Sequence, residues 1–153
     1  MNKKVKNATP LSYDGIQFKS ILEADTYKRL QEEGYTPEYE KHTYEVWEGR
    51  RFSVPCYDFH NNRKLRKNKW ELNTYKAQSI KYTPDFTFYA GDTFIVVEVK
   101  GFANDRYPYV KKLFRTWLDD NMPESMFFEI HNRGQLDSAI EIIKQQSNLR
   151  NNV

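Results

Sequence analysis

The chain lacks the features typical of secreted, membrane-spanning and zinc-binding proteins. It has one cysteine, Cys56, among 153 residues, so no internal disulfide can form. No apolar run approaches the length needed to cross a membrane, and no apolar segment follows the basic N-terminus as it does in a signal peptide. There is no internal repeat, and the three histidines (His42, His60 and His131) show no metal-ligand spacing. These absences predict a cytoplasmic protein with no membrane partner.

The net charge is also small, whereas aromatic residues are abundant. The formal net charge is +3, which by itself says little about a nucleic-acid partner because the distribution matters more than the sum. The 11 Tyr, 10 Phe and 3 Trp suit both core packing and base stacking. The length suits one domain with a real core. We expect an N-terminal arm over 1–17, one domain over 18–146 with a basic insertion at about 60–80, and a flexible tail over 147–153.

A hairpin is predicted around Gly91-Asp92, a favoured two-residue loop between runs of aromatic and β-branched residues. Its strands pair residues whose numbers sum to 183, which places Asp85 opposite Glu98 and Thr83 opposite Lys100. The other face of the hairpin is apolar. A slip of one residue would bring the carboxylates among apolar groups, so the pattern defines its own register.

The two facing carboxylates need a positive charge between them. Like charges directly opposite in a sheet are destabilising, and Lys100 supplies one charge against two. A hard divalent cation with oxygen ligands, Mg²⁺, completes the arrangement. The alternative is a solvated sheet end with an ordinary Glu98–Lys100 ion pair. The strand 94–99 is apolar on both faces until Glu98, so the charges occur where a buried strand emerges, which favours a site.

The remaining pattern predicts helices and strands around a mixed sheet, an α/β arrangement. The expected elements are a helix over 20–33, strands over 41–47 and 51–59 joined by Glu48-Gly49, the hairpin strands, a helix over 106–120, a strand over 126–130 and a helix around 136–143. Residues 61–82 are the least regular part of the chain.

A basic run lies within that irregular segment. It comprises Arg63, Lys64, Arg66, Lys67 and Lys69. Such a run is commonly a solvated loop, but beside a metal site it can contact phosphates. Both interpretations stay open.

Pro84-Asp85 followed by Glu98-Val99-Lys100 is similar to the motif of the PD-(D/E)XK nuclease superfamily. Longer matches resemble a subgroup of small phage-encoded, nuclease-like proteins classed as a domain of unknown function, over about residues 18–130. These matches are Ser20 to Ala24, Tyr82 to Phe86, Val97 to Gly101, and Tyr107-Pro108 through Lys112 to Phe114. The resemblance implies a restriction-endonuclease-like core, a mixed β-sheet flanked by helices in the order α-β-β-β-α-β.

The resemblance also implies a set of roles around Mg²⁺, with Mn²⁺ as a substitute. Asp85, Glu98 and the Val99 carbonyl would bind the metal, and Glu23 would complete the site from the first helix. Lys100 would orient the attacking water and stabilise developing charge. Because two adjacent carboxylates favour a protonated lysine, we expect an electrostatic role for Lys100 rather than that of a general base.

Several of these side chains have a second explanation. Ser20 to Glu23 has the spacing of a capping box, in which the glutamate accepts from the Ser20 amide. Lys112 and Arg115 are basic positions of the following helix that can meet a phosphate, but surface lysines are equally common there. Trp70, Tyr75 and Tyr82 can stack on bases, although core packing is the more common role for such residues.

The predicted function is that of a Mg²⁺-dependent DNA endonuclease, a metal-dependent phosphodiester hydrolase of phage or mobile-element origin. Branched or junction DNA is the expected substrate, since no sequence-reading module accompanies the core, and a homodimer would cut two strands symmetrically. If the protein is phage-encoded, it acts in the host cytoplasm. The alternatives are a catalytically inactive nuclease fold that binds DNA or protein, and a structural protein whose charged hairpin is mere surface.

Overall fold

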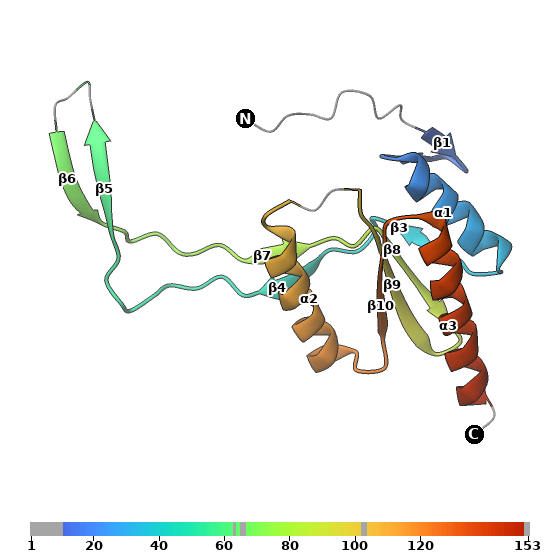
Figure 1. Ribbon diagram of the computed structural model, residues 1–153. Helices are drawn as coiled ribbons and strands as arrows, with labels where there is room; N and C mark the ends of the chain where they lie inside the picture. Colours follow the sequence, from blue (N-terminus) through green and yellow to red (C-terminus); the bar gives the residue numbers. More distant parts are fainter. Residues whose placement is uncertain (1–10, 63, 65–66, 102–103, 152–153) are drawn as a thin grey trace.

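A four-stranded mixed sheet lies at the centre of the computed structural model, which describes residues 11–151 except 63, 65–66 and 102–103 (Figure 1). Its strand order is β10-β9-β8-β3. Strand β8 (Phe86–Ala90) pairs antiparallel with β9 (Thr93–Val99) and with β3 (Glu38–Tyr39). Strand β10 (Met126–Ile130) runs parallel to β9.

The β8–β9 hairpin has the predicted register. Phe86 pairs with Val97 and Ala90 with Thr93, so paired numbers sum to 183. The ladder ends at Phe86, and the predicted pairings of Asp85 with Glu98 and of Thr83 with Lys100 lie beyond it. The β8–β9 ladder therefore ends just where the charged side chains begin, while β9 continues through Val99 beside β10.

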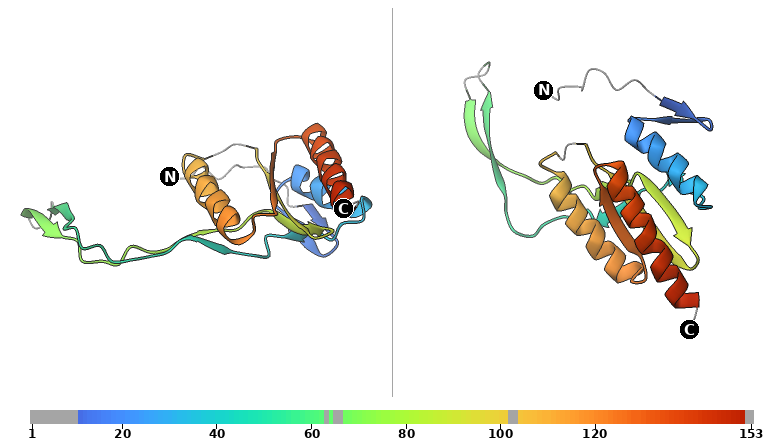
Figure 2. Two further views of the ribbon diagram at one scale, coloured as in Figure 1. Left: turned by 90° about the horizontal axis from the view of Figure 1, so that it is seen from below. Right: turned by 45° about the vertical axis from the view of Figure 1, so that its right-hand side comes forward.

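Helices cover both faces of this sheet (Figure 2). On one face α1 (Ile21–Glu32) and α3 (Arg133–Asn151) pack over the alternating apolar residues of β8 and β9. On the other face α2 (Tyr107–Asn121) packs over Phe94 and Val96. Glu98 belongs by alternation to the α2 face, and it is the charged member of an otherwise apolar row.

Local signals account for the helix ends. Ser20 caps α1, and Gly34, with φ of 85°, follows its last turn in a conformation that favours glycine. Pro108 lies in the first turn of α2, where its missing amide costs nothing. Helix α3 continues through Asn151, so it includes residues 147–151 of the predicted tail.

The described part of the predicted N-terminal arm is a short hairpin. Strands β1 (Leu11–Tyr13) and β2 (Ile16–Phe18) pair antiparallel, and Phe18 is fully buried against Tyr27. Residues 11–17 of the predicted arm therefore belong to a hairpin that Phe18 anchors on α1.

The predicted pairing of strands 41–47 and 51–59 is also wrong. Strand β4 (Tyr44–Trp47) pairs instead with β7 (Ile80–Tyr82), far along the chain. Between them β5 (Tyr57–Asn62) and β6 (Lys67–Leu72) form a two-stranded ribbon that projects away from the helices and the central sheet (Figure 1). This ribbon replaces the irregular loop expected over residues 61–82.

The described chain is thus a mixed α/β structure with three helices and several small sheets, one of them four-stranded. Among the described residues, no helix has the length and apolar character needed to cross a membrane.

Candidate active site

Two carboxylates lie together where the β8–β9 ladder ends. The Asp85 amide donates to Glu98 Oε2 at 3.1 Å, and the Val99 amide donates to Asp85 Oδ2 at 2.8 Å. These two amides lie beyond the last residue pair of the β8–β9 ladder, so they donate to side-chain oxygens instead. The backbone thereby holds Asp85 and Glu98 side by side, as the predicted register required.

Glu98 is a buried carboxylate with donors on both oxygens. Its residue exposure is 3%. Oε2 also accepts from the Tyr82 hydroxyl, and Oε1 lies 2.6 Å from Lys100 Nζ. A buried charge is tolerated only when it is paired and hydrogen-bonded, and Tyr82 and Lys100 meet that requirement.

Asp85 holds its proton more tightly than an exposed aspartate. Burial, together with the Glu98 charge, raises the pKa of Asp85 to about 7, and Glu23 adds to the shift. The Val99 amide and Lys100 oppose it. The negative charges around Asp85 therefore outweigh the single nearby ammonium group, as the sequence indicated.

Glu23 is held at the start of α1 and reaches toward this group. Its amide donates to Ser20 Oγ at 3.2 Å, while its Oε2 accepts from the Lys19 amide at 2.9 Å and from the Tyr39 hydroxyl at 2.7 Å. One hydrogen bond of the predicted capping box is present, from the Glu23 amide to Ser20 Oγ. In the other, the Glu23 carboxylate accepts from the amide of Lys19 and not from that of Ser20. The Glu23 charge contributes to the raised pKa of Asp85, so the two carboxylates interact.

A second cluster, at the start of α2, adjoins Lys100. Lys100 Nζ lies 3.9 Å from the centre of the Tyr107 ring, and the Tyr107 hydroxyl donates to Glu129 Oε2 at 2.8 Å. Lys111 Nζ donates to the same oxygen at 2.7 Å, and His131 Nε2 lies 3.0 Å from Glu129 Oε1. This cluster links the candidate site to α2 and β10.

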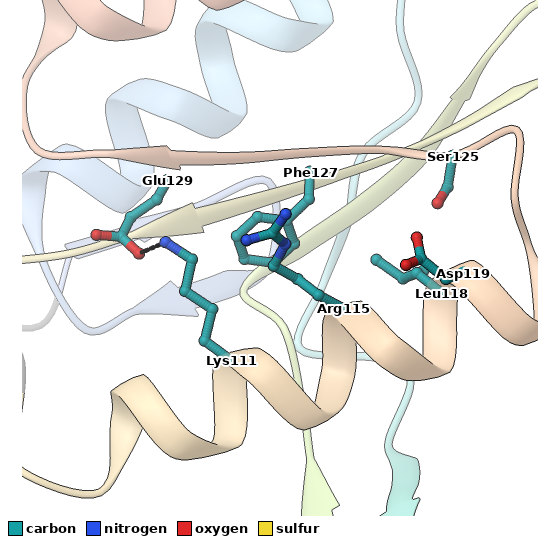
Figure 3. A pocket seen from close by; sticks show the side chains of 7 residues that line it. All are labelled: Lys111, Arg115, Leu118, Asp119, Ser125, Phe127 and Glu129. Carbon is teal, nitrogen blue, oxygen red and sulfur yellow. Dashed lines mark hydrogen bonds and ion pairs between the residues drawn. The ribbon is translucent and has the colours of Figure 1, made fainter.

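An open cavity of about 320 Å³ continues from Glu129 along the α2–β10 groove (Figure 3). Lys111 and Arg115 line it, and Lys111 bonds to Glu129 across it. Of the two basic helix positions predicted to meet phosphate, Arg115 lies in this cavity, whereas Lys112 is exposed and does not line it.

The structure does not bring the basic run to the carboxylates. Lys64 is in the turn of the β5–β6 ribbon and Lys69 is on β6, both away from the central sheet (Figure 1). Lys67 begins β6. Arg63 and Arg66 lie outside the described residues.

The donor set fits a hard cation held by few protein ligands. The described residues contain no group of three or more His, Cys, Asp or Glu side chains placed to hold a metal ion. Mg²⁺, however, is commonly held by one or two carboxylates, with water filling its other positions. Asp85 and Glu98 offer only oxygen, and the excess negative charge near Asp85 favours a cation.

Sequence reasoning missed the hydroxyl and acid groups that support the site. Tyr39, Tyr107 and Glu129 were not singled out, and Tyr82 was considered only for stacking or core packing. One signal was present, because Tyr82 stands three residues before Asp85 at the end of a strand. A tyrosine ring satisfies an apolar pattern, however, so the pattern gives no indication of where its hydroxyl points.

Comparison with known proteins gives one match. A family model described as "Protein of unknown function (DUF1064)" matches residues 3–126, a range that includes Glu23, Asp85, Glu98 and Lys100. No curated protein and no solved structure matches the chain.

Proposed function

The chain belongs to the DUF1064 family, whose description names no activity, and we propose from the site itself that it is a Mg²⁺-dependent DNA endonuclease. The observation that carries this proposal is the Asp85–Glu98 pair. Two carboxylates are fixed by main-chain amides at the end of adjacent strands, with Lys100 on one of them. Stability alone does not call for this arrangement, since like charges there are costly.

The order of the elements supports the same proposal. Around the central sheet the chain runs α1, β3, β8, β9, α2, β10, with β10 parallel to β9. This is the α-β-β-β-α-β order implied by the resemblance to PD-(D/E)XK nucleases. The β4–β7 segment, which includes the ribbon, is inserted between the first and second of these strands.

Asp85, Glu98 and the Val99 carbonyl would hold the metal, with Glu23 completing the site. When bound, a divalent metal supplies an activated water and neutralises charge on a phosphate. The residues do the positioning. The Val99 amide fixes one Asp85 oxygen, and Tyr82 together with the Asp85 amide fixes one Glu98 oxygen. Fixed ligands lower the reorganisation needed during reaction.

Lys100 supplies a cation beside the reacting phosphate. Its ammonium group lies between Glu98 Oε1 and the face of the Tyr107 ring, and its side chain is 19% exposed. That exposure leaves it open to a phosphate oxygen. Lys100 forms an ion pair with Glu98, and we assign it the stabilisation of negative charge on the phosphate and not the removal of a proton.

The α2 groove offers a path for the DNA backbone away from Lys100. Lys111 and Arg115 present two cations along the cavity, and Arg115 is exposed. Arginine binds phosphate through several fixed donors, which suits a contact that sets the position of a strand.

A second candidate is a nuclease fold that binds DNA without cutting it. Both Glu98 oxygens already have protein donors, and Glu23 Oε2 has two, so the site is satisfied internally. Calorimetric titration with Mg²⁺ or Mn²⁺ separates the two candidates. The endonuclease binds metal and loses that binding in Asp85→Ala, whereas an inactive scaffold takes up neither ion.

The direct test is a cleavage panel of junction, flap, nicked, single-stranded and duplex DNA, with Mg²⁺ or with chelator. The wild type is expected to cut at least one substrate only with metal, and Asp85→Ala and Lys100→Ala are expected not to cut. Lys144→Ala is the matched control, because Lys144 pairs with Glu33 and Glu141, away from the site. Activity that survives in the Asp85 or Lys100 variant would contradict the assignment.

A further inference from the structure

The β5–β6 ribbon has one apolar face that the described protein leaves uncovered. Strand pairing sets Tyr57 opposite Leu72 and Phe59 opposite Trp70, so the four side chains share a face. The Phe59 and Trp70 rings meet edge to face, with centroids 5.2 Å apart. Phe59 is nevertheless 50% exposed and Trp70 66% exposed. None of the four belongs to either buried core cluster.

The opposite face of the ribbon is charged. Asp58 pairs with Glu71 and His60 with Lys69, and Lys69 Nζ lies 2.6 Å from Glu71 Oε1. A two-stranded ribbon with one apolar face is marginally stable in water by itself. An exposed patch of large apolar side chains on such an element indicates a surface for a binding partner.

Two segments that run side by side form a stalk between the ribbon and strands β4 and β7 (Figure 1). Arg50 and Ala77 exchange main-chain hydrogen bonds of 3.0 and 2.9 Å, and the Asn73 amide donates to the Cys56 carbonyl at 2.7 Å. Gly49 sits where the two segments approach closely, since a Cβ there would lie 2.6 Å from the Ala77 carbonyl oxygen. The stalk is therefore a built element held at several points.

The stalk sets how far the ribbon reaches. Residues 48–56 form its outgoing segment, which bends at Ser53 and Val54. Nine residues extend at most about 30 Å, the length of about nine base pairs of a duplex. The ribbon would thus meet DNA well beyond the candidate active site.

Charge favours nucleic acid over a second copy of this chain. Over residues 57–72 the sequence has five Lys or Arg against two Asp or Glu. Two copies of the ribbon would each carry this excess of positive charge, whereas a phosphate backbone is complementary to it. The aromatic members of the uncovered face suit nucleobases, which stack on such rings whatever their sequence.

We propose that the β5–β6 ribbon is a DNA-binding arm whose aromatic face stacks on unpaired bases. Phe59 and Trp70 receive the bases, while the excess of basic residues in the ribbon sequence attracts the phosphate backbone. The arm thereby selects DNA with a gap or branch over continuous duplex. This inference rests on the proposed function for the choice of DNA, and it names the substrate structure that the active site alone leaves open.

The test compares Phe59→Ala/Trp70→Ala with the wild-type chain in binding to labelled gapped, junction and continuous duplex DNA. Chelator is present throughout, so the result does not depend on cleavage. The double variant is expected to lose about tenfold or more in affinity for gapped and junction DNA and little for duplex, as removal of stacked rings predicts. Tyr89→Ala, which removes an exposed ring from the central hairpin, is the matched control and keeps wild-type affinity.

Two further measurements keep the test decisive. Trp70→Tyr retains a stacking ring and is expected to bind gapped DNA within about threefold of wild type. Cys56, the chain's one cysteine, is exposed at the end of the stalk. A fluorophore attached to it would report DNA at the arm without a further substitution. Its signal should change with gapped DNA in the wild type and not in the double variant.

The proposal is overturned by unchanged affinity in the double variant, or by an equal loss on gapped and duplex DNA. It is also overturned if sedimentation shows a wild-type dimer that the double variant dissolves while DNA binding stays the same. The ribbon would then pair with a second copy. The cleavage panel tests the active site separately, so either proposal can fail alone.

Discussion

The main-chain amide of Asp85 donates to the carboxylate of Glu98 at 3.1 Å, although the two side chains carry like charge. Tyr82 donates its hydroxyl to the same carboxylate oxygen, and Lys100 pairs with the other. The negative charge of Glu98 is thus stabilised by three donors, whereas the Asp85 carboxylate accepts a hydrogen bond from the Val99 amide. The predictions for the site follow from this difference.

Tyr82→Phe removes one donor from a carboxylate that is 3% exposed. We expect a loss of about 1.5–3 kcal/mol in the free energy of unfolding, since hydrogen bonds to buried charged groups fall in that range. Urea unfolding measures it. Tyr89→Phe is the control, because Tyr89 lies on β8 and is 59% exposed. Equal, small effects of both substitutions would show that the Tyr82 hydroxyl does not support Glu98.

The pKa of Asp85 makes stability depend on pH. Burial and Glu98 raise it from an ordinary 3.8 to about 7, so the folded protein binds this proton more tightly than the unfolded chain. The resulting stabilisation is fully present below about pH 4 and is lost as the pH rises through about 7. Asp85→Asn removes this dependence. Measured without metal, the variant should therefore gain stability relative to wild type between pH 4 and 7.

Parallel pH profiles for the two proteins would show that Asp85 titrates normally. Added Mg²⁺ is expected to reduce the difference at pH 7, because a cation bound at Asp85 favours the ionised form.

Glu23→Gln separates the two roles of Glu23. An amide oxygen can still accept from the Lys19 amide and the Tyr39 hydroxyl, so the helix cap survives while the charge is lost. We expect the free energy of unfolding to stay within about 0.5 kcal/mol and cleavage to fall at least tenfold. A variant with wild-type cleavage would assign Glu23 to the cap alone.

Gly49→Ala tests whether the stalk is a built element. A Cβ at Gly49 would lie 2.6 Å from the Ala77 carbonyl oxygen and 2.7 Å from the Ser79 amide nitrogen, both main-chain atoms that cannot move aside easily. We expect a loss of about 1–3 kcal/mol by thermal unfolding. Gly101→Ala is the control, since a Cβ there meets nothing within 4 Å. Equal stability of the two variants would show that the two segments of the stalk can move apart at no cost in stability.

The central hairpin was readable from the sequence because several local signals agree. Gly91-Asp92 marks the turn, and strict alternation allows only one register, so the paired residues of β8 and β9 follow. The amphipathic repeat of α2 and the cap at Ser20 likewise define their helices. The adjacency of Asp85 and Glu98 is a direct consequence of that register.

The rest depends on contacts that local patterns do not carry. The sequence Glu48-Gly49 is typical of a hairpin turn. In the structure, however, the main chain of residues 77–79 lies so close to Gly49 that a Cβ would not fit. Strand β4 finds its partner β7 more than thirty residues later. The ribbon was missed because the alternation of apolar residues in its strands is short, with Tyr57 and Phe59 on one side of the basic run and Trp70 and Leu72 on the other. Tyr82, Tyr107 and Glu129 act through polar atoms whose direction only the fold determines.

The most direct test of the central claim is the cleavage rate of gapped or junction DNA under single-turnover conditions, with Mg²⁺ and excess protein. Wild type is compared with Lys100→Met, which keeps the length of the side chain and removes its charge. The account predicts metal-dependent cleavage that falls about a hundredfold or more in the variant, as expected for loss of a charge that stabilises the transition state. Cleavage at the wild-type rate by Lys100→Met, or by wild type in chelator, would contradict it.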